Sequence, residues 1–263
     1  MKLLHRFGLL LCPLFLWTTE CTTSPTGRRQ VQLLPDSQMA QMGDASFADL
    51  KAKQRVSNNP KYNQLVICIT NRLLTVMGMN PQEWEVKVFE DPTPNAFALP
   101  GNNVGVHTGM ITLVKNQDQL AAVIGHEIGH VLAHHGNERV SQSMLTQAGL
   151  VVADLVIGKN SKNDQLMMAA LGLGAQVGIL LPFSRKQEQE ADRLGVEYMA
   201  KAGFDPRAAG ELWKIMAQSG GKGPPEFLST HPSNESRIND LTSYAVQFVP
   251  VYEQTHPKPS CGL

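Results

Sequence analysis

Residues 126–130 read His-Glu-Ile-Gly-His, and this run constrains the chain more than any other feature. On a helix, residues four positions apart lie on one face, so His126 and His130 can bind one metal ion together. Glu127 then lies beside the metal, where it can accept a proton from water. The run predicts a zinc site with Glu127 as general base. A surface helix that carries these residues by chance is the alternative.

The surrounding sequence places the motif in the middle of a largely apolar helix. Asn116 is a suitable N-cap, Gln119 follows three residues later, and apolar residues recur at helical spacing from Leu120 to Leu132. Gly136 is a typical residue to end such a helix. Burying histidine and glutamate there without partners would cost free energy, which favours a metal ion over chance.

A catalytic zinc ion needs a third protein ligand, and His134 does not fit. It lies about 12 Å along the helix axis from the first histidine of the motif, too far for one ion with bonds of about 2 Å. A second helix, predicted to begin at a capping box of Ser184 and Gln187 and to end at Gly203, carries carboxylates instead. Glu188 and Asp192 share one face, so one could bind zinc while the other accepts the free N–H of a ligand histidine. The alternative is a solvated acidic face.

Four segments together resemble a known family. The run Glu-Gln-Glu-Ala-Asp-Arg-Leu-Gly from residue 188 is similar to the second zinc motif of the gluzincin metallopeptidases, which include the CAAX prenyl protease, HtpX and Oma1. Residues 95–101 resemble the substrate-cleft strand of that family, residues 125–135 its active-site helix, and residues 229–238 its Thr-His-Pro…Arg-Ile motif. Four ordered motifs are more specific than one. The pattern is most similar to bacterial periplasmic lipoprotein members of the BepA and LoiP type.

The resemblance implies an α+β, mostly helical fold: a zincin-like catalytic domain with a small sheet beside the His-Glu-x-x-His helix. It implies a zinc endopeptidase with one Zn²⁺ per chain. The implied zinc ligands are His126, His130 and Glu188, and Asp192 and Arg237 are implied to contact these ligands rather than the metal. The implied substrate-binding residues are Asn95, Ala96, Phe97 and Ala98.

His231 is a candidate catalytic residue in the Thr-His-Pro motif. We predict that it donates a hydrogen bond to the oxyanion, with Arg237 orienting its loop. His231 could instead fill the fourth zinc position in a resting enzyme, which would then be latent. We assign no role to His107, His134 and His135.

The N-terminus resembles a targeting segment. Residues 1–20 read as a signal peptide, because basic residues precede an apolar run at 7–17 that is too short to span a bilayer. Cys21 follows where a bacterial lipoprotein is acylated, although a glutamate directly before it is unfavourable. Residues 21–35 read as a flexible tether.

The 263 residues are 42% hydrophobic, enough for one sizeable core, which we expect at 36–250 with a C-terminal tail at 251–263. The 23 basic and 23 acidic side chains balance, which argues against nucleic acid as a partner. We expect Arg28 and Arg29 to belong to an ordinary solvated surface. Cys68 and Cys261 can pair in an oxidising compartment. A buried Cys68 with a free Cys261 on a loose tail is the open alternative.

Periodicity predicts helices at 36–56 and 60–77, and strands at 84–88, 97–99 and 104–107. A free sheet edge beside the zinc helix could bind an extended peptide through main-chain hydrogen bonds, whatever its sequence. This suits a protease that acts on unfolded chains.

Residues 144–183 contain two apolar runs separated by a polar stretch. Glycines and isolated polar residues interrupt both runs. We predict a helical hairpin packed beside the active site, with a hairpin dipping into the membrane as the alternative.

The expected function is hydrolysis of misfolded or stalled envelope proteins. We expect a periplasmic enzyme tethered to the outer membrane through lipidated Cys21, with the outer-membrane assembly machinery as an implied partner. The alternative is a non-catalytic or latent lipoprotein that assists assembly of outer-membrane proteins. An intact Glu127 favours the enzyme, because a structural site needs no general base.

Overall fold

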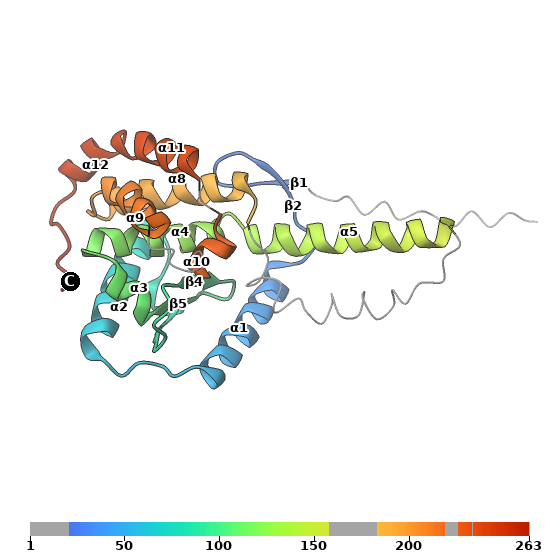
Figure 1. Ribbon diagram of the computed structural model, residues 1–263, viewed down its shortest axis with the longest axis horizontal. Coiled ribbons are helices and arrows are strands. Elements are labelled where there is room, and N and C mark those ends of the chain that lie inside the picture. Colours follow the sequence, from blue (N-terminus) through green and yellow to red (C-terminus); the bar gives the residue numbers. More distant parts are fainter. Residues whose placement is uncertain (1–20, 158–182, 219–225, 233, 263) are drawn as a thin grey trace, which may run out of the picture.

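The computed structural model describes residues 21–157, 183–218, 226–232 and 234–262 (Figure 1). Helices dominate, and the strands are short. The helices are α1 (Asp36–Lys53), α2 (Pro60–Val76), the 3-10 helix η1 (Pro81–Glu83), α3 (Thr108–Leu113), α4 (Gln117–Leu132), α5 (His135–Ile157), α8 (Arg185–Lys201), α9 (Arg207–Gln218), α10 (Glu226–Thr230), α11 (Glu235–Val246) and α12 (Val249–Gln254). The strands are β1 (Cys21–Thr23), β2 (Arg29–Val31), β3 (Glu85–Phe89), β4 (Ala96–Leu99) and β5 (Asn103–His107). The predicted mostly helical α+β class is confirmed.

The three longer strands form one small sheet in the order β3-β5-β4. β5 is central and buried throughout, parallel to β3 and antiparallel to β4. Within the described part of the chain, β4 pairs with β5 alone and leaves its other edge free. All three strands lie within one residue of their predicted bounds.

Helices α4 and α8 pack against each other along their lengths at the centre of the molecule (Figure 1). Their contact is close because both carry glycine there. A Cβ at Gly195 of α8 would lie 2.9 Å from the backbone nitrogen of His126, and one at Gly129 of α4 would lie 3.1 Å from the carbonyl oxygen of Ala191. This close approach brings α8 side chains within reach of the histidines on α4.

The main hydrophobic core surrounds this helix pair. It joins the sheet to α2, α4, α8 and α9 through fully or nearly fully buried side chains such as Leu73, Val106, Ile124, Met199 and Trp213. Burial of such side chains contributes about 1.5–3 kcal/mol each. The core therefore fixes the helices that carry the candidate site.

The ends of α4 and α8 are set by their caps. Asn116 accepts a hydrogen bond from the backbone of Gln119, and Ser184 forms the predicted capping box with Gln187. The predicted end of α4 at Gly136 is wrong, because the helix stops at Leu132 and a new helix begins at His135. His134 makes the reversal, with a left-handed φ of 51°.

Residues 21–35 differ from the expected tether. β1 and β2 pair as an antiparallel hairpin, and Gln30 within it is buried. The backbone nitrogen of Leu33 donates to Oγ of Ser141 on α5, 2.8 Å away. The segment is therefore held against the body of the protein by specific polar contacts that composition alone does not reveal.

The C-terminal tail also lies against the body. Cys68 of α2 and Cys261 are joined by a disulfide. The side chain of Gln117 binds the same tail through two hydrogen bonds. It donates to the carbonyl of Pro259 and accepts from the backbone nitrogen of Cys261, each at 2.8 Å.

Helix α5 begins at the α4–α8 pair, and its far half projects away from the body (Figure 1). It contains the first apolar run of the predicted 144–183 hairpin, so that arm does not pack beside the site along its length. Residues 158–182, which hold most of the second run, lie outside the described residues. No helix in the described part of the chain is both long and apolar enough to span a membrane.

Candidate metal centre

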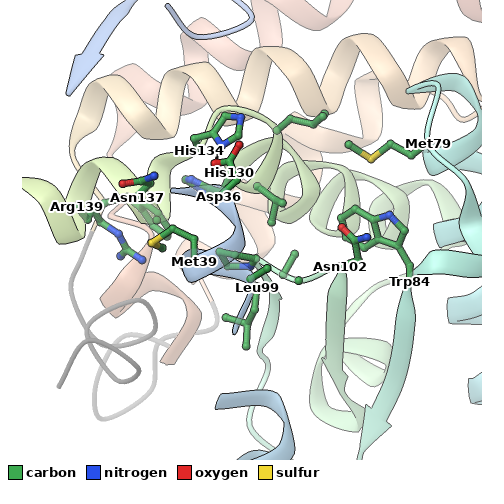
Figure 2. Close-up of a pocket in the computed structure, with 18 residues that line it drawn as sticks. Asp36, Met39, Met79, Trp84, Leu99, Asn102, His130, His134, Asn137 and Arg139 are labelled. Carbon is green, nitrogen blue, oxygen red and sulfur yellow. Dashed lines mark ion pairs between the residues drawn. The ribbon is translucent and has the colours of Figure 1, made fainter. Parts of the chain in front are cut away.

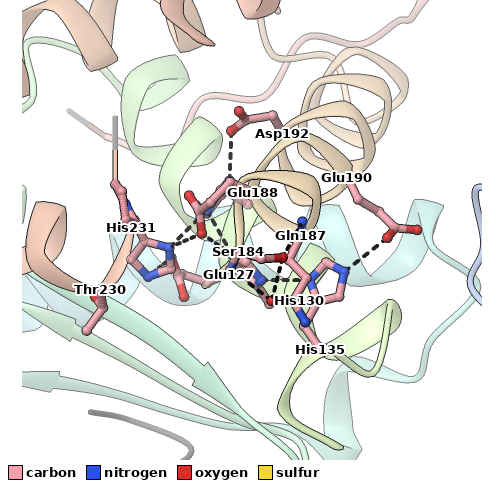
Figure 3. A network of polar contacts seen from close by, with 12 residues as sticks. Glu127, His130, His135, Ser184, Gln187, Glu188, Glu190, Asp192, Thr230 and His231 are labelled. Carbon is pink, nitrogen blue, oxygen red and sulfur yellow. Dashed lines mark hydrogen bonds and ion pairs between the residues drawn. The ribbon is translucent and has the colours of Figure 1, made fainter. Parts of the chain in front are cut away.

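Four buried side chains converge between α4, α8 and the segment that follows α10: His126, His130, Glu188 and His231. The Nε2 atoms of His126 and His130 are 3.0 Å apart. Nδ1 of His231 lies 3.2 Å from Nε2 of His126 and 3.0 Å from Oε1 of Glu188. Figure 3 shows the side chains of His130, Glu188 and His231 pointing toward one another.

These distances can be compared with those around a zinc ion. Zinc bonds of about 2.0–2.1 Å in a tetrahedron place neighbouring ligand atoms about 3.3 Å apart. In the structure Nε2 of His130 lies 3.3 Å from Oε1 of Glu188, and Nε2 of His126 lies 3.6 Å from Oε2. Three imidazoles and one carboxylate are also ligands that zinc accepts. The residues present therefore fit a zinc ion.

A carboxylate supports the first histidine. Nδ1 of His126 lies 2.9 Å from Oδ1 of Asp192, and this contact leaves Nε2 directed at the other ligands. Arg237 holds Asp192 in turn, with Nε donating to Oδ2 at 2.7 Å and Nη2 to Oδ1 at 2.9 Å. Asp192 therefore contacts His126 directly, and Arg237 acts on His126 through Asp192.

Arg237 connects the ligand carboxylate to the His231 loop. Its Nη1 lies 2.5 Å from Oε2 of Glu188 and donates to the carbonyl oxygen of Pro232 at 2.9 Å. Its guanidinium lies over the ring of Trp213, 4.2 Å from the centroid. The single cation thus orients both Glu188 and the loop.

Sequence reasoning missed the support of the second histidine. Nδ1 of His130 lies 2.8 Å from Nδ1 of His135, and Nε2 of His135 lies 3.1 Å from Oε2 of Glu190. His135 is fully buried. The position of His135 five residues after His130 was a sequence signal for this contact. The direction of the His135 side chain, however, depends on the reversal at His134, which the sequence pattern did not predict.

The other two histidines without an assigned role lie away from the ligands. His134 is exposed, with Nδ1 3.3 Å from Oδ1 of Asp36. His107 is buried edge-on to the rings of Phe89 and Phe97, with Nδ1 3.8 Å from Oδ2 of Asp91. Neither belongs to the four-residue cluster.

The two glutamates of the site have opposite electrostatic settings. Burial raises the pKa of Glu127, and the nearby charges of His231 and His126 oppose this only in part. Burial would also raise the pKa of Glu188, but the His231 charge and hydrogen bonds from His130 and His231 hold that pKa well below its usual range. Glu188 is thus suited to remain an ionised ligand, whereas Glu127 more readily accepts a proton.

His231 is held in a stack of rings. Its imidazole lies 4.4 Å from the ring of Phe227 and 5.1 Å from that of Phe183, centroid to centroid, and both pairs are nearly parallel. Its Nε2 is 3.4 Å from Oε1 of Glu127. The ring therefore lies between the general-base candidate and the ligands.

A cavity of about 360 Å³ adjoins the centre (Figure 2). Trp84, Ala98 and Leu99 contribute apolar walls, and His130 lines it from the ligand side. Arg139 lies at the same cavity with its guanidinium 3.6 Å from the ring centroid of Phe183, and burial lowers the pKa of Arg139 to about 10. The cavity can accept an apolar side chain next to the ligands.

Of the four predicted substrate-binding residues, three build the sheet and the core around it, and one lines the cavity. Ala96 is buried in the main core, and Phe97 packs across Gly105 against Phe89. The carbonyl oxygen of Asn95 accepts from the backbone nitrogen of His107. Ala98 alone of the four lines the cavity, and its backbone hydrogen-bonds with Glu127.

The family comparison decides the classification. The model of peptidase family M48 matches residues 60–245, which contain α4, α8 and all four converging residues. The chain belongs to peptidase family M48. The gluzincin membership inferred from the motifs is confirmed.

Relatives of this chain include a mitochondrial protein and a bacterial protein. The chain is 39% identical over 190 residues to the mitochondrial metalloendopeptidase OMA1 of Schizosaccharomyces pombe, covering 70% of this chain and 54% of that protein. It is 30% identical over 224 residues to the beta-barrel assembly-enhancing protease of Escherichia coli, covering 83% of this chain and 46% of that protein. The chain thus spans about half the length of these curated relatives.

Proposed function

We propose that this M48 chain is a zinc endopeptidase in which His126, His130 and Glu188 hold one Zn²⁺. The observation that carries the proposal is the convergence of these buried ligand atoms beside Glu127. A purely structural metal site would have no use for a buried carboxylate at this position.

Bound zinc would supply Lewis acidity, which makes water a better nucleophile at neutral pH and polarises the peptide carbonyl. Glu127 accepts the proton of the attacking water and passes it to the leaving amine. Burial of Glu127 favours its protonated form between these two transfers. Asp192 and Arg237 keep His126 and Glu188 oriented throughout.

The substrate binds as an extended chain along the free edge of β4. The position of Ala98 supports this, because its backbone lies against Glu127 and its side chain lines the adjoining cavity. Main-chain pairing at a sheet edge selects extended, unfolded segments rather than a particular sequence. The apolar cavity then receives one substrate side chain.

The resting enzyme is latent, with His231 as the fourth ligand. Nδ1 of His231 lies as close to Glu188 and His126 as a ligand of the same ion would. An imidazole in that position excludes the water that catalysis needs. Catalysis would require the His231 loop to move, and the oxyanion role predicted for His231 is the competing interpretation.

The proposed location is the bacterial envelope, with misfolded envelope proteins as substrates. The support is the sequence of residues 1–21 and the name of the Escherichia coli relative, a beta-barrel assembly-enhancing protease. Residues 1–20 and lipidation of Cys21 lie outside the structural account. A latent or non-catalytic lipoprotein that assists outer-membrane protein assembly is the second candidate, favoured by the position of His231.

The test is zinc-dependent cleavage of casein by wild type and by Glu127→Gln. The substitution retains the shape of the side chain but removes the base, and we expect kcat/KM to fall about 10²–10⁴-fold with zinc retained. If wild type and His231→Ala both bind zinc but neither cleaves unfolded substrate, the non-catalytic candidate replaces the enzyme.

A further inference from the structure

Arg28, in the turn of the β1–β2 hairpin, binds two carboxylates from two different helices. Its Nη1 and Nη2 donate to the two oxygens of Glu138 on α5, each at 2.7 Å. Its Nε donates to Oε2 of Glu190 on α8 at 2.7 Å. Thr26 in the same turn donates to the other oxygen of Glu190. The expectation that Arg28 belongs to a solvated surface is therefore wrong.

The contact continues inward from Glu190. Oε2 of Glu190 lies 3.1 Å from Nε2 of His135, and Nδ1 of His135 lies 2.8 Å from Nδ1 of His130. Figure 3 shows this row of side chains from Glu190 through His135 to His130. One continuous set of contacts thus runs from the N-terminal hairpin to a metal ligand.

Hydrogen-bond chemistry gives the row a direction. An ionised carboxylate only accepts, so Nε2 of His135 carries the hydrogen. Nδ1 of His135 is then the acceptor, and Nδ1 of His130 must donate to it. This tautomer leaves the lone pair on Nε2 of His130, the atom 3.0 Å from Nε2 of His126. The row therefore sets His130 as a metal ligand.

We propose that Arg28 is a positioning residue for the metal centre, and that the N-terminal hairpin increases metal affinity through Glu190 and His135. This inference rests on the proposed zinc site but not on peptidase activity. In this proposal the hairpin, which begins at Cys21, supports the metal centre and also connects the domain to the residues before Cys21.

The planar fork of arginine is suited to this position. Arg28 uses two nitrogens for Glu138 and a third for Glu190, which fixes the directions of both carboxylates. Gln187 of α8 donates to Glu138 as well, at 2.8 Å. Without Arg28, two adjacent carboxylates would repel each other and Glu190 would lose the partner that orients it toward His135.

The experiment measures zinc affinity of the full chain by competition with a chromogenic chelator. We expect Arg28→Ala to bind zinc about 10-fold more weakly, at the lower end of the effects of outer-shell partners. Arg29→Ala is the matched control, because Arg29 is an exposed cation in the same hairpin, and it should bind as wild type does. The visible spectrum of the Co²⁺-loaded protein should change for Arg28→Ala alone.

Thermal unfolding of the metal-free proteins separates positioning from folding. Arg28→Lys keeps the charge but not the planar fork, so it should lose part of the zinc affinity. It takes the place of Arg28→Ala in the test if Arg28→Ala does not fold. Wild-type zinc affinity in the folded Arg28 variants would overturn the proposal. Absence of zinc binding in wild type would instead overturn the metal centre itself.

Discussion

A Cβ on Gly195 of α8 would lie 2.9 Å from the backbone nitrogen of His126 on α4. The two helices that carry the candidate metal ligands therefore meet through backbone atoms as well as through side chains. Glycine at this position lets α8 approach closely enough for Glu188 to reach the histidines of α4.

Gly195→Ala should separate the two helices. We expect a loss of about 1–3 kcal/mol in the free energy of unfolding, because the added methyl meets backbone rather than a side chain that can rotate. Urea unfolding of the metal-free protein measures it. Gly136→Ala is the control, since the nearest atoms to its Cβ would be 3.7 Å away. Equal stabilities of the two variants would contradict the close-contact account.

Asp192→Ala should weaken zinc binding without removing a ligand. His126 would lose the carboxylate 2.9 Å from its Nδ1, and such losses cost about 10–100-fold in metal affinity. Chelator competition gives the value, with Asp240→Ala as an exposed acidic control. An Asp192→Ala affinity equal to that of wild type would show that His126 needs no such partner.

Breaking the Cys68–Cys261 disulfide should destabilise the fold. The bond links α2 to the tail across 193 residues, and removing such a crosslink typically lowers the free energy of unfolding by about 2–4 kcal/mol. Urea unfolding of wild type with and without reductant measures the difference. The double variant Cys68→Ser with Cys261→Ser should not respond to reductant; no response in wild type either would refute the pairing.

His231→Ala distinguishes the two roles considered for His231. As a resting fourth ligand, its removal should raise the initial rate of casein cleavage several-fold. As an oxyanion donor, its removal should lower kcat about 10²–10³-fold. His256→Ala, which changes an exposed histidine of the C-terminal tail, is the control and should leave the rate unchanged. A fall in rate for His231→Ala alone would refute latency.

The sequence predicted the parts of the site that depend on helical spacing. His126 and His130 are four residues apart on one helix, and Glu188 and Asp192 are four apart on another, so periodicity placed each pair on a common face. The capping residues Asn116 and Ser184 predicted where these helices begin, because cap chemistry is local.

The contacts that depend on distant partners could not be predicted in this way. Arg28 and Glu190 are 162 residues apart, and no local pattern distinguishes Arg28 from the exposed Arg29 beside it. His135 points toward His130 only because His134 adopts a left-handed conformation, which is uncommon for a residue other than glycine. Tertiary geometry decides both contacts.

The most direct test of the metal centre is a crystal structure of the zinc-loaded protein with anomalous diffraction at the zinc edge. The account predicts one zinc ion per chain, about 2.0–2.2 Å from Nε2 of His126, Nε2 of His130 and a carboxylate oxygen of Glu188. Nδ1 of His231 should complete the site in the resting enzyme. Zinc bound elsewhere, or no anomalous peak between α4 and α8 at saturating zinc, would contradict the account.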